Sequence, residues 1–575
     1  MATYNTPGVY VREIPTLPAS VAAVATAIPA FIGYTERADN NGASLLNIPK
    51  RISSLMEYEK YFGGPMPEPG ITINIDALTG NIMANAPASP SNYIMYYQMQ
   101  LYFSNGGGPC YIVSVGTYYE PLAPMNIADF QAGLNAVALE DEPTLIAFPD
   151  ARGLPQADFY NLYEAALAQC NTLQDRFTII DLHSDGSTPD GAAATLRNEL
   201  ASDYLNYGAA YYPHLRTAIP YHYLADEVMI LTGPPISQVS YHSDPGFPLT
   251  DNGIEVIYRG VIGSPTVTIT LLAVGTVGTE YIDFNVSGDD ITITLPGGEA
   301  GGPTGSTPTQ IRDAWNIWKN TPGNDPGDFE INRAGTYHVR VSNAVATVDI
   351  SAQNDSNVTL EDLELTDNAL FNAAKAAIAQ LTVTVPPSAA IAGVYARIDR
   401  DRGVWEAPAN TPLANVIAPT VKVSDAMQDT LNVDPVSGKS INAIRTFAGK
   451  GTLVWGARTL AGNDNEWRYV PTRRLFIMAE ESIKKATSWA VFEPNDARTW
   501  MKVKTQIGNF LTGLWRAGAL AGAKAEEAFF VNVGLGVTMD TQDILEGRMN
   551  IEIGMAAVRP AEFIILKFSH KLQES

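Results

Sequence analysis

The chain has 575 residues, of which 46% are apolar and 17% are charged, so it is long enough for several domains and apolar enough to bury a core in each. These values exclude disorder as the general state of the chain. The net charge is −24, from 37 Lys and Arg against 61 Asp and Glu. Because phosphate contacts come from Lys and Arg, this balance argues against a nucleic-acid binder, and we expect no direct contact with nucleic acid.

The terminal segments are predicted to be strands without local partners. Residues 1–20 carry a short β-prone run at 9–14 and little apolar sequence near it, which indicates an extended arm, and residues 562–575 carry a second such run. An unpaired strand exposes backbone N–H and C=O groups, so both ends are expected to pair with another chain, the alternatives being an edge strand within the chain and a final strand of the C-terminal domain. The residues predicted to form these inter-subunit strands are Val9, Tyr10, Val11, Arg12, Phe563, Ile564, Ile565, Leu566 and Phe568.

Two cysteines, Cys110 and Cys170, cannot form a disulfide scaffold, which fits a reducing compartment. Residues 20–33 are apolar, but Pro29 interrupts them and Arg12 is their only upstream basic residue, which disfavours a signal peptide. No run approaches the ~20 apolar residues that a membrane span requires, so we expect no membrane insertion.

An α/β pattern fills the middle of the chain. Apolar strands are predicted at 144–148, 177–182 and 209–212, with helices at 157–169 and 192–200 between them, which is typical of a parallel sheet. A helical pattern at 368–381 is predicted to return to this layer after an interruption.

The interruption differs in composition. Residues 251–350 contain 14 Gly and 13 Thr but only 5 basic residues, and short alternating runs at 266–271, 281–286, 291–295 and 337–341 predict a small antiparallel β domain. Trp315 and Trp318 lie in a helix predicted at 310–319, which we expect to pack across that domain.

The predicted fold class is therefore a multidomain α+β and α/β protein: a core of mixed sheet and helices with extended terminal arms, an α/β middle domain and an inserted antiparallel β domain. The predicted domains are an arm at 1–20, the first part of the core at 21–120, the middle domain at 121–243, the insert at 244–365, the return helix at 366–385, the C-terminal core at 386–561 and a terminal strand at 562–575.

Motifs for chemistry are sparse. Gly438, Lys439 and Ser440 match the end of a phosphate-binding loop, but Val433 stands where the leading glycine is required, so a turn is the better interpretation. The six histidines and two cysteines form no metal-binding spacing, and no serine lies in a GxSxG motif. We expect no cofactor and no metal.

The best enzyme hypothesis uses Asp150 and Asp181, each of which follows a predicted parallel strand, together with His183. Ligand sites of open α/β sheets lie at these strand ends. The alternative is that Asp and His end strands because they suit turns, and no nucleophile or second acid lies near them in sequence, which favours the alternative.

Long blocks toward the C-terminus carry a specific resemblance. Residues 386–388, 393–399 and 402–410 (PPS, GVYARID and RGVWEAPAN) resemble the central block of contractile tail sheath proteins, which occur in phage tails and phage-like injection particles. Residues 473–489, 492–496, 515–523 and 528–531 resemble the next blocks, and residues 6–13 and 27–35 resemble the opening of the family. The middle matches loosely and the Gly/Thr-rich segment hardly at all.

This resemblance implies a structural protein that polymerises with itself as six-subunit helical rings around an inner tube and shortens to drive the tube through a target envelope. It also implies terminal strands that cross to neighbouring copies, contacts with baseplate and terminal cap proteins, and assembly in the bacterial cytoplasm before the phage tail or particle is released. The insert is then expected on the outside of this helical polymer, the sleeve around the tube. An adhesin built around the insert is a third hypothesis, but it leaves the two terminal strands unexplained.

The uneven charge indicates where the inner tube binds. Residues 466–575 contain 14 basic and 13 acidic residues, whereas the rest of the chain contains 23 and 48. If Asp496 caps a helix at 497–509, then Arg498, Lys502 and Lys504 form a basic stripe that faces an acidic tube. The alternative is an ordinary amphipathic helix with a solvated face.

Overall fold

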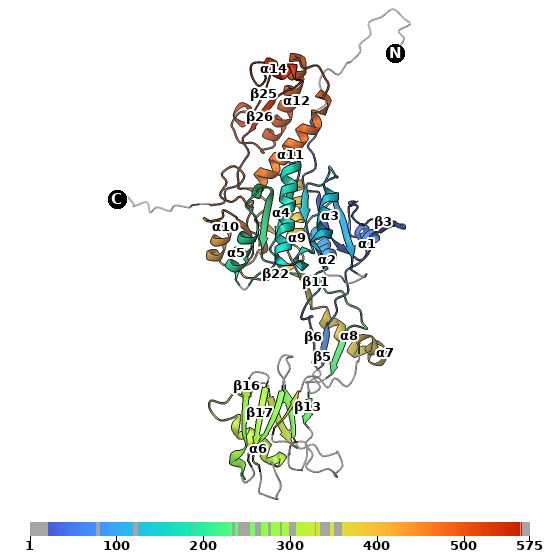
Figure 1. The fold of residues 1–575 in the computed structure, drawn as a ribbon, viewed down its shortest axis with the longest axis vertical. Coiled ribbons are helices and arrows are strands. Elements are labelled where there is room, and N and C mark those ends of the chain that lie inside the picture. Colours follow the sequence, from blue (N-terminus) through green and yellow to red (C-terminus); the bar gives the residue numbers. More distant parts are fainter. Residues whose placement is uncertain are drawn as a thin grey trace, which may run out of the picture. The chain divides into compact units, whose positions relative to one another are not determined.

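A computed structural model gives the fold of the chain (Figure 1). It describes residues 21–75, 81–118, 125–186, 188–232, 236–239, 254–258, 266–273, 276, 278–287, 290–297, 306–327, 329–333, 345–349, 359–563 and 565. The chain divides into two compact units, of which unit 1 comprises the residues up to 66, 91–220 and from 382 onward, and unit 2 comprises 67–90 and 221–381. The domain boundaries expected from the sequence remain predictions.

Unit 1 is built on a nine-stranded sheet. Its strands, in order across the sheet, are β21 (Thr411–Pro412), β24 (Gly451–Val454), β23 (Ile441–Phe447), β10 (Gly208–Tyr212), β9 (Phe177–Asp181), β8 (Leu145–Ala147), β1 (Pro29–Thr35), β7 (Cys110–Thr117) and β4 (Lys50–Ile52). The strands from β23 to β7 pair in parallel, whereas β4, β24 and β21 pair antiparallel at the two margins. The parallel sheet predicted from the apolar runs is confirmed.

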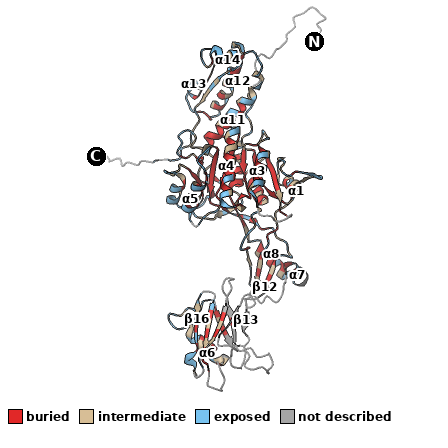
Figure 2. Cartoon of the chain, viewed as in Figure 1, coloured by how far each residue is buried: buried red, intermediate tan, exposed pale blue. Residues whose placement is uncertain are grey.

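Helices cover both faces of this sheet. Successive residues of a strand point to opposite faces, and on β1 a Cβ atom at Gly33 would lie 3.1 Å from Met95 of α2 (Met95–Ser104). The preceding Ile32 instead lies against Gly133 of α3 (Ile127–Val137), on the other face. Helix α9 (Ser388–Asp401) packs with α2, and α4 (Gln156–Leu173) packs with α3. The strands between these layers are largely buried (Figure 2).

Smaller elements complete this part of unit 1. Helix α5 (Pro189–Glu199) packs against α4 and α10 (Asp425–Asn432), and β20 (Thr382–Val385), β11 (Leu215–Pro220) and β22 (Val416–Pro419) form a three-stranded antiparallel sheet. Further short elements are α1 (Leu55–Phe62), β2 (Asp39–Asn40), β3 (Ala43–Ser44) and 3₁₀ turns at Ala151–Gly153, Leu205–Tyr207 and Ser488–Ala490.

The C-terminal core of unit 1 is a helical layer on a hairpin. Its elements are α11 (Val470–Ala486), α12 (Ala497–Arg516), α13 (Ala525–Ala528), β25 (Phe529–Val533), α14 (Thr541–Leu545) and β26 (Ile551–Met555). Val503, Ile507 and Leu511 follow each other at helical spacing and are fully buried, so the apolar side of α12 closes this core. Asp496 caps α12 as predicted, but the helix ends at Arg516 instead of residue 509 because the apolar spacing continues through Leu514.

The described residues of unit 2 form three sheets. One consists of β12 (Met229–Thr232), β5 (Thr72–Ile75) and β6 (Ile82–Asn85), and helices α7 (Leu360–Thr366) and α8 (Asn368–Ile378) belong to the same unit, where α8 packs against β6. The second consists of β13 (Ile236–Val239), β14 (Ile254–Tyr258) and β18 (Phe329–Arg333). The third consists of β16 (Asp283–Ser287), β17 (Asp290–Leu295), β15 (Thr266–Leu271) and β19 (Val345–Asp349).

The third sheet corrects one prediction. The insert was expected to be antiparallel, but β15 and β17 pair in parallel over six residues, so this sheet is mixed. Helix α6 (Pro308–Trp318) packs across it as predicted, with Trp315 fully buried against Phe284 and stacked on Trp318. The predicted strand at 337–341 lies outside the described residues. No helix in the described part of the chain is long and apolar enough to cross a membrane.

Candidate functional site

The two carboxylates of the enzyme hypothesis have structural partners. Asp150 is fully buried, and its two carboxylate oxygens accept hydrogen bonds from the backbone N–H of Tyr34 (2.7 Å) and of Ile94 (2.7 Å), the residue that precedes α2. Burial raises the pKa of Asp150 to about 7, against the lowering effect of these backbone donors. Asp150 therefore joins the end of β1 to the beginning of α2.

Asp181 holds the beginning of α9 in the same way, at the end of β9. Its Oδ1 accepts a hydrogen bond of 2.9 Å from the backbone N–H of Ser388, the first residue of that helix, and burial raises its pKa to about 7. The ring of His183 contacts the carbonyl oxygen of Leu154 at 2.9 Å through Nε2. A carboxylate at a helix N-terminus satisfies backbone N–H donors that lack a partner within the helix. This structural role accounts for both buried aspartates without a catalytic one.

The apparent end of a phosphate loop is also structural. The ammonium group of Lys439 donates to the carbonyl oxygens of Arg197 (2.8 Å) and of Leu200, which lie at the end of α5. Lys439 therefore neutralises the C-terminal end of that helix, and Gly438 provides a turn at φ 72°. Within the described ranges, no group of three or more His, Cys, Asp and Glu side chains is placed to hold a metal ion.

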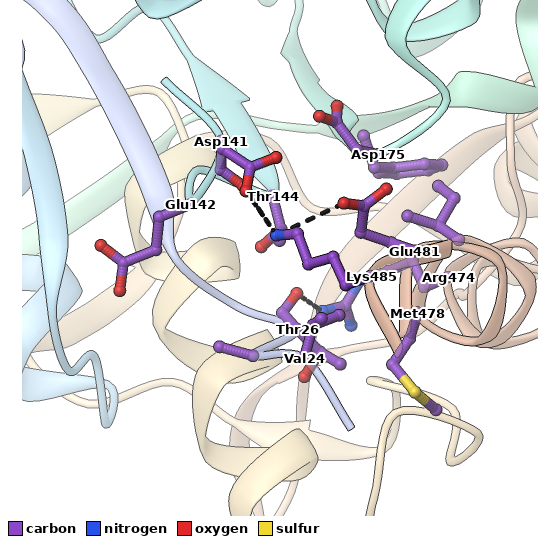
Figure 3. A pocket seen from close by; sticks show the side chains of 13 residues that line it. Val24, Thr26, Asp141, Glu142, Thr144, Asp175, Arg474, Met478, Glu481 and Lys485 are labelled. Carbon is purple, nitrogen blue, oxygen red and sulfur yellow. Dashed lines mark hydrogen bonds and ion pairs between the residues drawn. The ribbon is translucent and has the colours of Figure 1, made fainter. Parts of the chain in front are cut away.

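A hollow lies where residues 24–26 run beside α11 (Figure 3). Its volume of about 60 Å³ is far below the roughly 300 Å³ of small-molecule sites, so it does not accommodate an organic substrate. Lys485 of α11 spans the hollow, with its Nζ 2.7 Å from Asp141 and 3.3 Å from Glu481. The hollow thus belongs to the contact between the beginning of the described chain and the C-terminal core.

A buried ion pair fixes residues 24–26 to that core. Arg474 of α11 donates to both carboxylate oxygens of Asp399 in α9 (2.9 and 2.5 Å) and to the carbonyl oxygen of Thr26 (2.8 Å). The hydroxyl of Thr26 donates to Asp399 at 2.5 Å. The guanidinium also lies 4.5 Å above the ring of Tyr395. Two helices and the N-terminal segment therefore share one cluster of charge-assisted hydrogen bonds.

A second cluster fixes the other end of the described chain. The Glu562 carboxylate accepts hydrogen bonds from Arg458 through Nε (2.9 Å) and through the terminal nitrogen (2.6 Å), from Asn432 (2.8 Å) and from the Tyr469 hydroxyl (3.2 Å). Burial of Glu562 opposes ionisation, but these donors outweigh it and hold the pKa of the carboxyl below its ordinary value. Beyond this cluster, Phe563 is 71% exposed.

The predicted arm residues are only partly described. Phe563 and Ile565 are exposed and lie in no strand of the described chain. The other predicted arm residues, Val9, Tyr10, Val11, Arg12, Ile564, Leu566 and Phe568, lie outside the described residues.

The basic residues predicted to face the inner tube lie on α12, and their role there remains a prediction. Arg498, Lys502 and Lys504 are all exposed; Arg498 and Lys502 are one helical turn apart, whereas Lys502 and Lys504 flank the buried Val503 on its two sides. Helix α12 also carries Arg516 at its end and contains no Asp or Glu in its 20 residues, in a chain with a net charge of −24. Arg498 forms an ion pair of 3.2 Å with the capping Asp496.

The hairpin beneath α12 has a β edge on each side. Strands β25 and β26 pair with each other over five residues and constitute a two-stranded sheet of their own among the described residues. Val531 faces α12 and is buried, whereas Phe530 on the opposite face is 48% exposed and its ring lies against Gly554 of β26. Two-stranded sheets are marginal alone, and this one depends on α12 for its stability.

Sequence reasoning missed the two charge clusters. Arg474 and Asp399 are 75 residues apart, and Arg458 and Glu562 are 104 residues apart, so no local pattern brings them together. The higher share of basic residues in the C-terminal fifth was a signal for Arg474 alone and is compatible with a solvated surface as well, because Arg458 lies before that fifth.

Sequence comparison finds similarity to tail sheath proteins over part of the chain. Residues 462–571 match the family model described as the phage tail sheath C-terminal domain. The tail sheath protein of Enterobacteria phage T4 is 29% identical over 132 residues, which is 22% of this chain and 19% of that protein. The tail sheath protein of Vibrio phage KVP40 is 28% identical over 142 residues. The chain thus aligns with about a fifth of the length of these curated relatives.

Solved structures match over almost the full length. The sheath complex of the extracellular contractile injection system PVC, in its contracted state, is 25% identical, with a TM-score of 0.54 and coverage of 99% of both chains. The contracted helical sheath of the anti-feeding prophage is 26% identical, with a TM-score of 0.51 and coverage of 99% of this chain and 100% of that chain.

Proposed function

This chain belongs to the phage tail sheath family, whose members are structural proteins and not enzymes, and from that premise we propose that it is the contractile sheath subunit of a phage tail or an extracellular injection particle. Copies polymerise as six-subunit helical rings around an inner tube. The sheath then shortens and drives the tube through a target envelope.

The observation that carries this proposal is the exposure of two large apolar side chains near the C-terminus. Phe563 and Ile565 are two residues apart, so they lie on the same face of an extended strand, and both are more than two thirds exposed. An apolar face of this kind, directly after the well-anchored Glu562, is suited to donation to another copy. Val9, Tyr10, Val11 and Arg12 are proposed to act in the same way from the N-terminus.

The hairpin of β25 and β26 is the best candidate to receive these strands. A strand added to either edge would form backbone hydrogen bonds, each contributing about 0.5–1.5 kcal/mol net. Several such bonds per segment, repeated in every copy, keep the lattice connected while the folded bodies rotate. Addition of strands also turns a marginal two-stranded sheet into a more stable one.

The exposed stripe of Arg498, Lys502 and Lys504 is proposed to face the inner tube. Exposed ion pairs are individually weak and are screened by salt, which suits a contact that must be released during contraction. Reversal of both lysines, Lys502→Glu with Lys504→Glu, should reduce co-sedimentation with tubes, whereas the same reversal at the exposed Lys450 and Lys524 should not. Equal binding by the two double variants would remove this assignment.

The remaining partners follow from the assembly. The anti-feeding prophage chain in the baseplate structure is 26% identical with a TM-score of 0.51, which supports contact with a baseplate at one end of the sleeve, and a terminal cap is proposed at the other. Assembly is proposed in the bacterial cytoplasm. The insert within unit 2 is proposed to lie on the outside of the sleeve, where a lattice tolerates added domains.

Deletion of residues 2–15 tests the strand-exchange mechanism. The truncated subunit should stay soluble and folded, because the deletion leaves every described buried residue of unit 1 in the chain, but it should no longer form striated cylinders in negative-stain electron microscopy. The full-length chain is the control. Normal cylinders from the truncated subunit would refute donation of the N-terminal segment.

A further inference from the structure

Helix α11 contacts the chain segment that leads in from the N-terminus at two points. Arg474 donates to the carbonyl oxygen of Thr26 at 2.8 Å, and the hydroxyl oxygen of Ser482, two turns later, accepts the backbone N–H of Val24 at 3.0 Å. Figure 3 shows Val24 and Thr26 lying along this helix. Because the contacts use backbone groups as well as side chains, they fix the path of residues 24–26 along the helix.

The beginning of the same helix holds the segment that leads out to the C-terminus. Tyr469 immediately precedes α11 and donates its hydroxyl to Glu562 at 3.2 Å. Arg458, which grips the same carboxylate, forms a backbone bridge with Tyr469, and the adjacent N–H of Val470 donates to the carbonyl oxygen of Ala457 at 3.0 Å. Two of the three residues that hold Glu562, Arg458 and Tyr469, are therefore tied to the first turn of α11, and the third, Asn432, belongs to α10.

We propose that α11 couples the two terminal segments of the subunit mechanically, with the clusters at Glu562 and at Thr26 acting as clamps, so that a pull on one segment is carried to the other through this helix. The proposal rests on the sheath function above and adds to it the path that force takes through each subunit. Glu562, Arg458 and Ser482 are then positioning residues for strand exchange.

The chemistry of the clamps suits this role. Arg458 is 5% exposed and Arg474 is 3% exposed, and each forms charge-assisted hydrogen bonds to its carboxylate through two nitrogen atoms. Bonds of this type are geometrically specific and cost more to break than neutral ones, because the remaining charge is left buried. The described residues 558–563 around Glu562 lie in no helix or strand, so the clamp supplies that fixation.

A double-mutant cycle of two conservative substitutions tests the coupling. Glu562→Gln removes the charge but keeps the shape, and Ser482→Ala removes the acceptor of the Val24 N–H. Loss of the charged contact should raise the subunit concentration needed for sleeve formation about tenfold or more, and loss of the neutral bond about fivefold, as sedimentation measures it. Because the clamps act in series, the double variant should be no worse than Glu562→Gln alone.

Controls separate this inference from loss of folding and from the proposed function. Glu526→Gln makes the same chemical change at an exposed position of the C-terminal core and should leave assembly unchanged. The melting temperature of each unassembled variant should stay within a few degrees of the wild-type value, and hydrogen exchange of the amides of residues 561–563 should rise in Glu562→Gln only. Sleeve formation by the wild-type chain tests the function itself.

Two results would overturn the coupling. If the effects of the two variants multiply, to about fiftyfold or more in the double variant, the clamps act independently. If Glu562→Gln assembles like Glu526→Gln while the wild-type chain forms sleeves, Glu562 does not position the strand, and the sheath assignment stands without the clamp.

Discussion

The ion pair between Arg474 and Asp399 offers a quantitative test of how this subunit is held together. Asp399→Ala removes two hydrogen bonds from Arg474 and one from the Thr26 hydroxyl, and it leaves the guanidinium without a counter-ion. The side chains are only 3% and 6% exposed, so water cannot replace the lost acceptor. Removing one partner of such a buried pair costs about 3–5 kcal/mol.

The same helix supplies a matched control. Asp401 lies two residues further along α9 and pairs with Arg400 at 3.0 Å, but both side chains are more than half exposed. Asp401→Ala should therefore change the opening free energy by only about 0–1 kcal/mol. Because both variants remove one carboxylate from α9, the difference between their opening free energies measures the effect of burying the ion pair.

Hydrogen exchange of the α9 and α11 amides measures this difference within unit 1. Local exchange is preferable to a global unfolding midpoint, because a chain with two compact units need not unfold in one step. Opening of both helices should become easier by about 3–5 kcal/mol in Asp399→Ala. Equal exchange in the Asp399 and Asp401 variants would refute the reasoning that the buried cluster fixes these helices together.

Three further outcomes are expected. Gly393→Ala should destabilise unit 1 by more than about 2 kcal/mol, because its Cβ would lie 2.5 Å from the carbonyl oxygen of Tyr102. Gly513→Ala, on the open side of α12, should stabilise it by about 0.5–1 kcal/mol. Hydrogen exchange of the α9 and α12 amides measures both changes, and equal exchange in the two variants would contradict them. Burial raises the pKa of Asp181 to about 7, so the folded state holds a proton there that the unfolded state loses, and the free energy of unfolding should fall as the pH rises from about 4 to 7. Asp181→Asn should flatten that part of the stability profile, and an unchanged profile would contradict the burial argument. Lys439→Met should weaken protection of the last turn of α5 in hydrogen exchange, and unchanged protection would exclude its role as a helix cap.

The sequence was informative where structure is local. The continuous apolar runs that became β8 and β9 predicted a buried parallel sheet, because strands covered on both faces lack alternation. The cap at Asp496 followed from a short side chain before a helical apolar spacing.

Long-range pairing could not be predicted in the same way. The strands β15 and β17 show the alternation of any half-buried strand, and alternation does not distinguish a parallel from an antiparallel partner, so the insert was wrongly expected to be antiparallel throughout. The enzyme hypothesis had the same weakness: Asp181 ends β9 and Asp150 follows β8, but their partners are backbone N–H groups at the N-termini of helices far away along the chain.

Strand exchange between copies is the central claim, and a high-resolution cryo-electron microscopy map of assembled sleeves tests it most directly. The account predicts that the segment beyond Glu562 and the segment around Val9 of each copy continue into hairpins of adjoining copies and pair there with β25 or β26. A map in which both segments fold back onto their own subunit would contradict it.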